Sequence, residues 1–330
     1  MATFKMNISC FFFVQVSLLL LLSSFAPTSA QGLKVGFYDK TCPKAEAIVK
    51  KSVSDAMKND PTIGAPLLRM FFHDCFVRGC EGSVLLELKN KKDEKNAPPN
   101  LSLRGFEVID NVKAAVEKEC PGVVSCSDVL ALVARDAVVA LDGLSWGVET
   151  GRRDGRATNI NEARSNLPSP LDNITRLISQ FDSKGLDKKD LAVLSGGHTV
   201  GQGHCPLIAN RLYNFTGKGD SDPDLDTEYA ATLRKRCKPT DTTTALEMDP
   251  GSFKTFDESY FKLVSQRRGF FQSDAALLNN QETKSYVLKQ MNSRGSTFSK
   301  DFGVSMVKMG RIGVLTGKAG EVRKKCRMVN

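Results

Sequence analysis

The chain has 330 residues, of which 41% are hydrophobic, and a formal net charge of +9 at pH 7. That size and apolar content can bury a large core, and they suit one large domain or two closely packed lobes rather than a flexible multidomain array. The basic residues are scattered and no nucleic-acid-binding motif accompanies them, so we expect adsorption to acidic polymers and no nucleic-acid partner.

Residues 1–30 have the composition of a secretory signal peptide. Lys5 precedes the apolar stretch CFFFVQVSLLLLL, and small residues end at Ala30, which predicts cleavage before Gln31. A membrane anchor is the competing interpretation, but the apolar stretch is short for a span. We therefore expect a secreted mature chain over residues 31–330, with no membrane segment after cleavage.

Most of the mature chain has the periodicity of amphipathic helices. The repeating apolar positions are Val49, Val53 and Met57; Val108, Val112 and Val116; Val129, Leu132 and Val133; and Ile174, Leu177, Ile178 and Phe181. Strand signals are few and short, RIGVLTG at residues 311–317 being one, and glycines and prolines mark the loops. We expect a mainly α fold with very little β structure.

The first unusual histidine is His73, one of only three in the chain. It lies four residues after Arg69 and behind Pro66, which suits the first turn of a helix, so the imidazole and the guanidinium share one helix face. Such a pair offers a base that titrates near neutrality beside a permanent cation. Taken alone, a core histidine beside a surface arginine is the plainer interpretation.

The second unusual histidine is His198, which continues the helical spacing of Leu191 and Leu194. It follows Gly196 and Gly197, whose lack of side chains would let a flat, bulky group approach the backbone. A histidine at a helix C-terminus, stabilised by the helix dipole, is the alternative. The chain has no HExxH, GxSxG, Walker-type or zinc-spaced CxxC motif, so a zinc hydrolase and other common enzyme classes lack their residues.

The acidic segment DSDPDLD at residues 220–226 alternates carboxylates as a calcium loop does. Leu225 stands where the EF-hand glycine belongs and Ala231 where the bidentate glutamate belongs, so a solvated loop is expected. His204 adjoins a cysteine and is expected in a structural or surface position, and Trp146 is expected to serve packing.

Nine cysteines are present, and Cys10 lies in the signal peptide. The remaining eight are an even number, consistent with disulfides in an oxidising compartment, but spacing alone leaves open the roughly 105 pairings that eight cysteines allow. Asn173 and Asn214 lie in Asn-x-Ser/Thr sequons that suit surface glycosylation of a secreted protein.

The mature chain resembles the plant secretory (class III) haem peroxidases over essentially its whole length. The segments that carry the resemblance occur in the family's order: FYDKTCPKAEAIV, LLRMFFHDCFVRGCEGSVLL, SLRGFEVID, CSDVLALVARDAV, WGVETGRRDG, NLPSP, DLAVLSGGHTVG and GEVRKKCRMVN. The resemblance implies a single domain of two helical lobes enclosing one haem b. One lobe would lie around His73 and the other around His198.

The resemblance also implies roles for the site residues. His198 would be the axial ligand of the haem iron, and Asp274 would support its other ring nitrogen; without the resemblance Asp274 is an ordinary helix N-cap. His73 would move a proton between the oxygens of hydrogen peroxide while Arg69 stabilises the charge that separates. Asn100 would orient His73, so we expect this third sequon to be buried and unglycosylated.

Two calcium sites built from oxygen ligands are implied as well. The distal site would use Asp74, Val77, Gly79, Glu81 and Ser83, with Val77 and Gly79 contributing carbonyls and Glu94 acting through water. The proximal site would use Thr199, Asp249, Ser252, Thr255 and Asp257. Glu81 departs from the aspartate usual in the family, and weaker distal calcium binding is the resulting hypothesis. The disulfides implied by the resemblance are Cys42–Cys120, Cys75–Cys80, Cys126–Cys326 and Cys205–Cys237.

The expected function is that of a secreted, monomeric haem peroxidase that reduces hydrogen peroxide and oxidises phenolic donors by one-electron steps near Pro168, as in cell-wall cross-linking or peroxide removal. Pectin-like polysaccharide is the expected acidic partner. The chain ends at Asn330 without the C-terminal extension of vacuolar members, which favours the apoplast or cell wall. The alternative is a catalytically weak wall-binding or structural protein.

Overall fold

The computed structural model describes residues 32–291 and 296–330, and the predicted signal peptide lies outside them. The α-helices are α2 (Ala45–Asn59), α3 (Gly64–Val77), α4 (Phe106–Glu119), α5 (Cys126–Ala140), α6 (Ile160–Asn166), α7 (Ile174–Asp182), α8 (Lys188–Ser195), α9 (Ala209–Tyr213), α10 (Thr227–Arg236), α11 (Ser259–Ser265), α12 (Gln272–Ala276), α13 (Gln281–Gln290) and α14 (Phe298–Met309). Short 3-10 helices cover Ser83–Leu85, Glu94–Asn96, Pro98–Asn100, Gly196–Thr199, Cys205–Leu207 and Leu277–Asn279. The predicted mainly α fold is confirmed.

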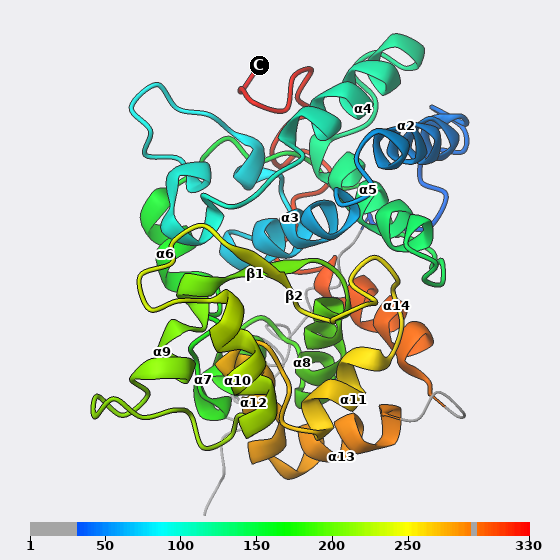
Figure 1. Ribbon diagram of the computed structural model, residues 1–330. Helices are drawn as coiled ribbons and strands as arrows, with labels where there is room; N and C mark the ends of the chain where they lie inside the picture. Colours follow the sequence, from blue (N-terminus) through cyan, green and yellow to red (C-terminus); the bar gives the residue numbers. More distant parts are fainter. Residues whose placement is uncertain (1–31, 292–295) are drawn as a thin grey trace, which may run out of the picture. The chain divides into compact units, whose positions relative to one another are not determined.

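Most of the predicted helical segments form because they have one apolar face to bury, whereas α5 is buried on all sides from Cys126 to Val138. Val49 and Val53 of α2 are buried, as are Val112 and Val116 of α4. Helix α3 begins at Gly64 and carries Pro66 in its first turn, as expected. Figure 1 shows α2, α3, α4 and α5 gathered together, and α3 packs along α5.

The predicted strand at residues 311–317 is wrong. Only Leu315 bridges to another segment, through one pairing with Arg153. Gly313 and Gly317 take positive φ angles of 54° and 61°, which turn the chain out of an extended run. The two short strands are instead β1 (Gln202–His204) and β2 (Ala245–Glu247), paired antiparallel.

The main apolar core connects the helices that carry the two predicted histidines. It includes Phe76 of α3 and Leu130 of α5, and continues through Phe261 of α11 to Phe298 of α14. A smaller cluster lies beside β1 and β2 and contains Phe270 and other buried apolar residues. The segment from Gly32 to Asn330 forms one compact unit, while its division into two lobes stays a prediction.

Four disulfides join the predicted pairs of cysteines. Their S–S distances are 2.08 Å for Cys42–Cys120, 2.01 Å for Cys75–Cys80, 2.10 Å for Cys126–Cys326 and 1.90 Å for Cys205–Cys237. The Cys126–Cys326 bond joins the start of α5 to the C-terminal segment, and it closes a sequence separation of 200 residues. Long loops of this kind restrict the unfolded chain most.

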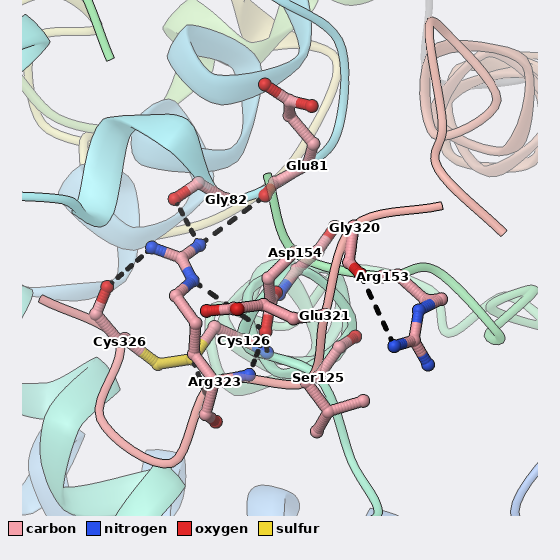
Figure 2. A network of polar contacts seen from close by, with 12 residues as sticks. Glu81, Gly82, Ser125, Cys126, Arg153, Asp154, Gly320, Glu321, Arg323 and Cys326 are labelled. Carbon is pink, nitrogen blue, oxygen red and sulfur yellow. Dashed lines mark hydrogen bonds and ion pairs between the residues drawn. A yellow bond between two sulfur atoms is a disulfide. The ribbon is translucent and has the colours of Figure 1, made fainter. Parts of the chain in front are cut away.

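A buried arginine fixes the C-terminal segment against the loop that follows α3 (Figure 2). Arg323 is fully buried, and its guanidinium donates to the carbonyls of Cys326 at 2.7 Å and Gly82 at 2.6 Å. The carboxylate of Asp154 accepts the backbone N–H of Arg323 at 2.8 Å and that of Ser127 at 2.8 Å. This network holds the loop that carries the predicted distal calcium ligands.

The acidic segment 220–226 is only partly the solvated loop that we expected. Asp222 is buried and pairs at 2.6 Å with Nε of Arg211, which is itself fully buried. Leu225 joins the smaller apolar cluster, and Asp226 caps α10 through the N–H of Tyr229. The positive charge beside the buried carboxylate of Asp222 is therefore that of Arg211.

Candidate active site

The amide of Asn100 fixes the orientation of His73. Nδ2 of Asn100 donates to the backbone carbonyl of Glu94 at 2.8 Å, so Oδ1 faces Nδ1 of His73 at 2.5 Å. An amide oxygen only accepts hydrogen bonds, so Nδ1 of the imidazole carries the proton. The lone pair then lies on Nε2, which accepts a hydrogen bond of 3.1 Å from Nε of Arg69.

The electrostatics of this pair suit a neutral base beside a cation. Burial lowers the pKa of His73 well below 6.5, and the charge of Arg69 lowers it further. Burial also lowers the pKa of Arg69 to about 10, which leaves the guanidinium charged at neutral pH. Ser102 Oγ accepts from Arg69 at 3.0 Å and the Pro99 carbonyl at 2.7 Å, so the cation is held in place.

His198 is supported by the carboxylate of Asp274. Helix α8 ends at Ser195 and tightens into the 3-10 turn Gly196–Thr199, which carries the imidazole away from the α-helical face. Nδ1 of His198 lies 2.7 Å from Oδ1 of Asp274, and 37% of the histidine side chain is exposed. Asp274 is not the N-cap of α12, as the plainer interpretation had it: Phe271 holds that position, and Oδ2 of Asp274, three residues later, accepts the backbone N–H of Phe271 at 2.7 Å.

The side chain of Tyr260, which the sequence analysis did not identify, also contacts Asp274. The hydroxyl of Tyr260 donates to Oδ1 of Asp274 at 3.0 Å, the same oxygen that faces His198. Burial raises the pKa of Tyr260 well above its usual value, and the charge of Asp274 adds to the shift, so the phenol remains a donor. No local pattern links a tyrosine in α11 with a carboxylate in α12, and the contact requires the folded chain.

The two glycines before His198 have different roles. A Cβ at Gly196 would lie 2.5 Å from the ring of Phe298, so this glycine serves core packing. We had expected it to allow the approach of a ligand, and that expectation is wrong for Gly196. A Cβ at Gly197 would meet only Leu68 and Phe302, each at 3.9 Å. A side chain at Gly197 would therefore make only ordinary contacts, whereas one at Gly196 would collide with the core.

The arrangement fits the haem that the sequence predicts. Within residues 32–291 and 296–330, Nε2 of His198 has no hydrogen-bond partner, whereas Nδ1 is held by a buried carboxylate. An imidazole with one nitrogen bonded to a carboxylate and the other nitrogen free is a suitable iron ligand. The neighbouring Gly197 adds no side chain of its own beside this ligand.

The predicted distal calcium ligands do not all lie ready for a cation. Asp74 and Glu94 are fully buried, and burial raises the pKa of Asp74 to about 7 and that of Glu94 to about 8. Both carboxylate oxygens of Glu94 and the hydroxyl of Ser83 lack hydrogen-bond partners in the described part of the chain. These oxygens fit a divalent cation. Glu81 instead pairs with Arg78 at 3.0 Å.

Two further predicted distal groups are backbone carbonyls. The carbonyl of Val77 accepts a long hydrogen bond of 3.4 Å from Nζ of Lys184, and that of Gly79 accepts from the N–H of Glu81 at 2.7 Å. A carbonyl oxygen has two lone pairs, so these bonds leave room for a cation.

The predicted proximal calcium ligands converge. The hydroxyl of Thr199 lies 3.2 Å from Asp249 and 3.1 Å from Asp257, and Ser252 donates to Asp257 at 2.8 Å. Burial raises the pKa of Asp249, and the like charge of Asp257 adds to the shift. The hydroxyl oxygen of Ser259, which was not predicted, lies within hydrogen-bond distance of both carboxylates. Two carboxylates among hydroxyls form an oxygen site that suits Ca²⁺.

The remaining predicted ligand and the predicted donor site lie in loops. The N–H of Thr255 donates to the Ser252 carbonyl at 2.8 Å within the proximal loop.

Pro168, the predicted donor-binding residue, follows α6 and is half-buried. The N–H of Ser273 donates to the carbonyl of Pro170 at 3.0 Å. The loop that carries Pro168 is therefore tied to α12, which bears Asp274.

The three sequons differ in exposure. Asn100 is 2% exposed, as expected from its contact with His73. Asn173 and Asn214 are exposed, and each uses its side-chain oxygen to accept a backbone N–H. Both exposed asparagines keep the nitrogen that carries a glycan free of these bonds.

Known proteins share this sequence over nearly its whole length. The family model described as peroxidase matches residues 49–293. Peroxidase 56 of Arabidopsis thaliana is 83% identical over 330 residues, which cover 100% of both chains. Peroxidase 27 of the same plant is 73% identical over 315 residues, 96% of this chain and 98% of the relative. Peroxidase 1 of Oryza sativa subsp. japonica is 53% identical over 325 residues, 96% of this chain and 98% of the relative.

Proposed function

Because this chain belongs to the plant peroxidase family, we propose how its own residues perform the peroxidase reaction. The protein is an enzyme that reduces hydrogen peroxide with electrons from donor molecules. The family implies haem, which when bound supplies the iron that takes two oxidising equivalents from peroxide and returns them to donors singly. The proposed cofactor is haem b, which Nε2 of His198 would hold through its iron.

His73 is the proposed proton carrier. Its Nε2 lone pair takes the proton from one oxygen of hydrogen peroxide and delivers it to the other oxygen, which leaves as water. Arg69 stabilises the negative charge that develops on the leaving oxygen. The observation that carries this proposal is the chain of hydrogen bonds from Glu94 through Asn100 to His73, which keeps Nε2 unprotonated beside Arg69.

Asp274 is the proposed support of the axial ligand. A hydrogen bond from Nδ1 of His198 to a buried carboxylate raises the electron density at Nε2, which would make His198 a stronger donor to a haem iron. Tyr260 bonds to the same carboxylate oxygen and limits this effect. The two residues together set how strongly His198 donates.

Phenols are the proposed donors, and the loop of Pro168 is the proposed place where they bind. Each phenol gives up one electron and one proton, so two phenols and one hydrogen peroxide yield two phenoxyl radicals and two waters. The link between the Pro170 carbonyl and Ser273 supports this placement, because it holds the loop beside the segment that bears Asp274.

We also propose that the protein binds two calcium ions and is a monomer. Its proposed location is extracellular, in the apoplast or cell wall. The oxygen atoms around Asp249 and those of Glu94 and Ser83 support the two calcium sites. In the described residues no helix is long and apolar enough to cross a membrane. Without Lys5 of the predicted signal peptide the chain has 45 basic and 37 acidic residues, and this net charge of +8 supports binding to acidic wall polysaccharide. The basic C-terminal turn of α10 contributes Arg234, Lys235 and Arg236.

The catalytically weak wall-binding protein is not favoured. The relatives with the highest identity quoted above are peroxidases, and Arg69, His73, His198 and Asp274 are all present. The visible spectrum of the purified protein before and after one equivalent of hydrogen peroxide tests the function. A haem band that shifts rapidly and returns on addition of a phenol supports the peroxidase reaction. A folded protein without a haem band would support the binding-protein alternative.

A further inference from the structure

Glu81 is held by an arginine of its own loop. Nε of Arg78 donates to Oε1 of Glu81 at 3.0 Å, and the side chain of Glu81 is only 9% exposed. Nη1 of Arg78 also lies 2.6 Å from a carboxylate oxygen of Glu162 in α6. The guanidinium therefore bridges two carboxylates, and the more buried of the two is Glu81.

The space for this longer carboxylate comes from Gly155. A Cβ at position 155 would lie 2.5 Å from Cδ of Glu81 and 2.6 and 2.7 Å from its two carboxylate oxygens. The φ angle of Gly155 is outside the left-handed region, so the absence of a side chain is needed here for space and not for backbone conformation. The N–H of Gly155 donates to the Glu81 carbonyl at 2.8 Å, which fixes the two residues against each other.

The oxygens that lack partners lie elsewhere in the same loop region. Glu94 is fully buried with both carboxylate oxygens unpaired among the described residues, and the Ser83 hydroxyl is unpaired as well. Asp74 is fully buried, and within residues 32–291 and 296–330 its hydrogen-bond donors are the backbone N–H groups of Gly82 at 2.8 Å and Val84 at 3.3 Å. These oxygens have no side-chain cation paired with them and suit a divalent ion, whereas Glu81 already has a cation in Arg78.

We propose that Glu81 is the ion-pair partner of Arg78 and is not a ligand of the distal calcium. The inference rests on the proposed distal calcium site and changes its ligand set. Asp74, Ser83 and the loop carbonyls hold the ion, with Glu94 behind them. Arg78, Glu81 and Gly155 act as one unit that anchors the loop independently of calcium.

Measurements of calcium binding distinguish whether Glu81 is a ligand of the distal calcium or only the ion-pair partner of Arg78. The test measures the calcium content and the calcium affinity of the purified, haem-loaded protein and of its Glu81→Gln and Asp74→Asn variants, by metal analysis and chelator titration. Glu81→Gln is expected to keep both ions, with a distal dissociation constant within about threefold of wild type, while Asp74→Asn loses one ion. Loss of the distal ion in Glu81→Gln, or weakening by tenfold or more, would overturn the proposal.

A double-mutant cycle measures the ion pair itself, without reference to calcium. Arg78→Gln, Glu81→Gln and the double variant are compared in thermal unfolding at saturating calcium. The double variant is expected to be no less stable than the worse single variant, whereas additive losses would contradict the pairing. A wild-type protein that binds only one calcium ion would refute the proposed distal site, and the cycle would still decide the partner of Glu81.

Gly155→Ala provides a further check on the same unit. The added methyl group would collide with the carboxylate of Glu81. We expect Gly155→Ala to lower the midpoint of thermal unfolding in the wild-type background, and to have a smaller effect when Glu81 is replaced by alanine. An equal effect in both backgrounds would contradict the close approach of the two residues.

Discussion

The hydroxyl of Tyr260 donates a hydrogen bond of 3.0 Å to the carboxylate of Asp274, at the oxygen that also faces Nδ1 of His198. Both residues are buried, so the bond is shielded from water. A carboxylate that accepts from a phenol is less basic than one that accepts from the imidazole alone. Tyr260 is therefore expected to weaken the support that Asp274 gives to the axial ligand.

Tyr260→Phe is predicted to lower the reduction potential of the haem iron. Without the phenol, Asp274 attracts the Nδ1 proton of His198 more strongly and the imidazole becomes a stronger donor. A hydrogen bond worth about 1 kcal/mol corresponds to a change on the order of tens of millivolts. Tyr286→Phe is the matched control, because it removes a phenol–carboxylate bond of the same length, to Asp301. An unchanged or raised potential in Tyr260→Phe would contradict the tuning role.

Asn100→Asp is predicted to move the pH dependence of the reaction with peroxide. In the wild type the pKa of His73 lies well below 6.5, so the rate should stay constant as the pH falls through 6.5. A carboxylate at position 100 favours the imidazolium and raises the pKa of His73. As the pH is lowered, the rate of the variant should therefore begin to fall at a higher pH than the rate of the wild type. Stopped-flow rates between about pH 4 and pH 9 measure the shift. Asn173→Asp, at an exposed helix cap, is the control, and identical profiles for wild type and Asn100→Asp would refute the positioning role.

Removal of calcium is predicted to destabilise the protein more as the pH rises. Without the cation, burial holds the pKa of Asp74 at about 7 and that of Glu94 at about 8, both above their unfolded values. A raised carboxyl pKa contributes stability at low pH that is lost as the pH rises through the folded value. The gap in unfolding temperature between the calcium-loaded and the chelated protein should therefore widen from pH 5 to pH 8. A gap that does not change over this range would contradict the prediction.

Arg323→Met is predicted to lower the free energy of unfolding by about 3–5 kcal/mol, because it leaves Asp154 buried without a cation. It also leaves the carbonyls of Gly82 and Cys326 without their donor. Arg153 is the control, because its partly exposed side chain donates to the carbonyl of Gly320 at 3.5 Å (Figure 2). Arg153→Ala should cost less than about 1 kcal/mol. Denaturant unfolding measures both variants, and equal losses would contradict the account.

Sequence reasoning succeeded where a signal was local or was carried by the family resemblance. Helical spacing predicted that Arg69 and His73 share one face of α3, and the pairs of disulfide cysteines came from the resemblance. The predicted strand at 311–317 failed because apolar composition says little about the turns that Gly313 and Gly317 impose.

Contacts between distant segments were the part that sequence reasoning missed. The space for Glu81 depends on Gly155, and the charge of Asp222 is neutralised by Arg211 across a fold that no spacing rule describes. Tyr260 lies in a different helix from Asp274, so its hydrogen bond is visible only in the folded protein. Such contacts follow from packing, which single-residue patterns do not encode.

The central claim is that His73 carries the proton during cleavage of hydrogen peroxide. The most direct measurement is the stopped-flow rate constant for the reaction of hydrogen peroxide with the haem-loaded His73→Ala variant, compared with wild type and with His204→Ala. We predict a rate constant about 10²–10⁴-fold lower for His73→Ala, and a wild-type value for His204→Ala. A His73→Ala variant that cleaves peroxide as fast as wild type would contradict the account.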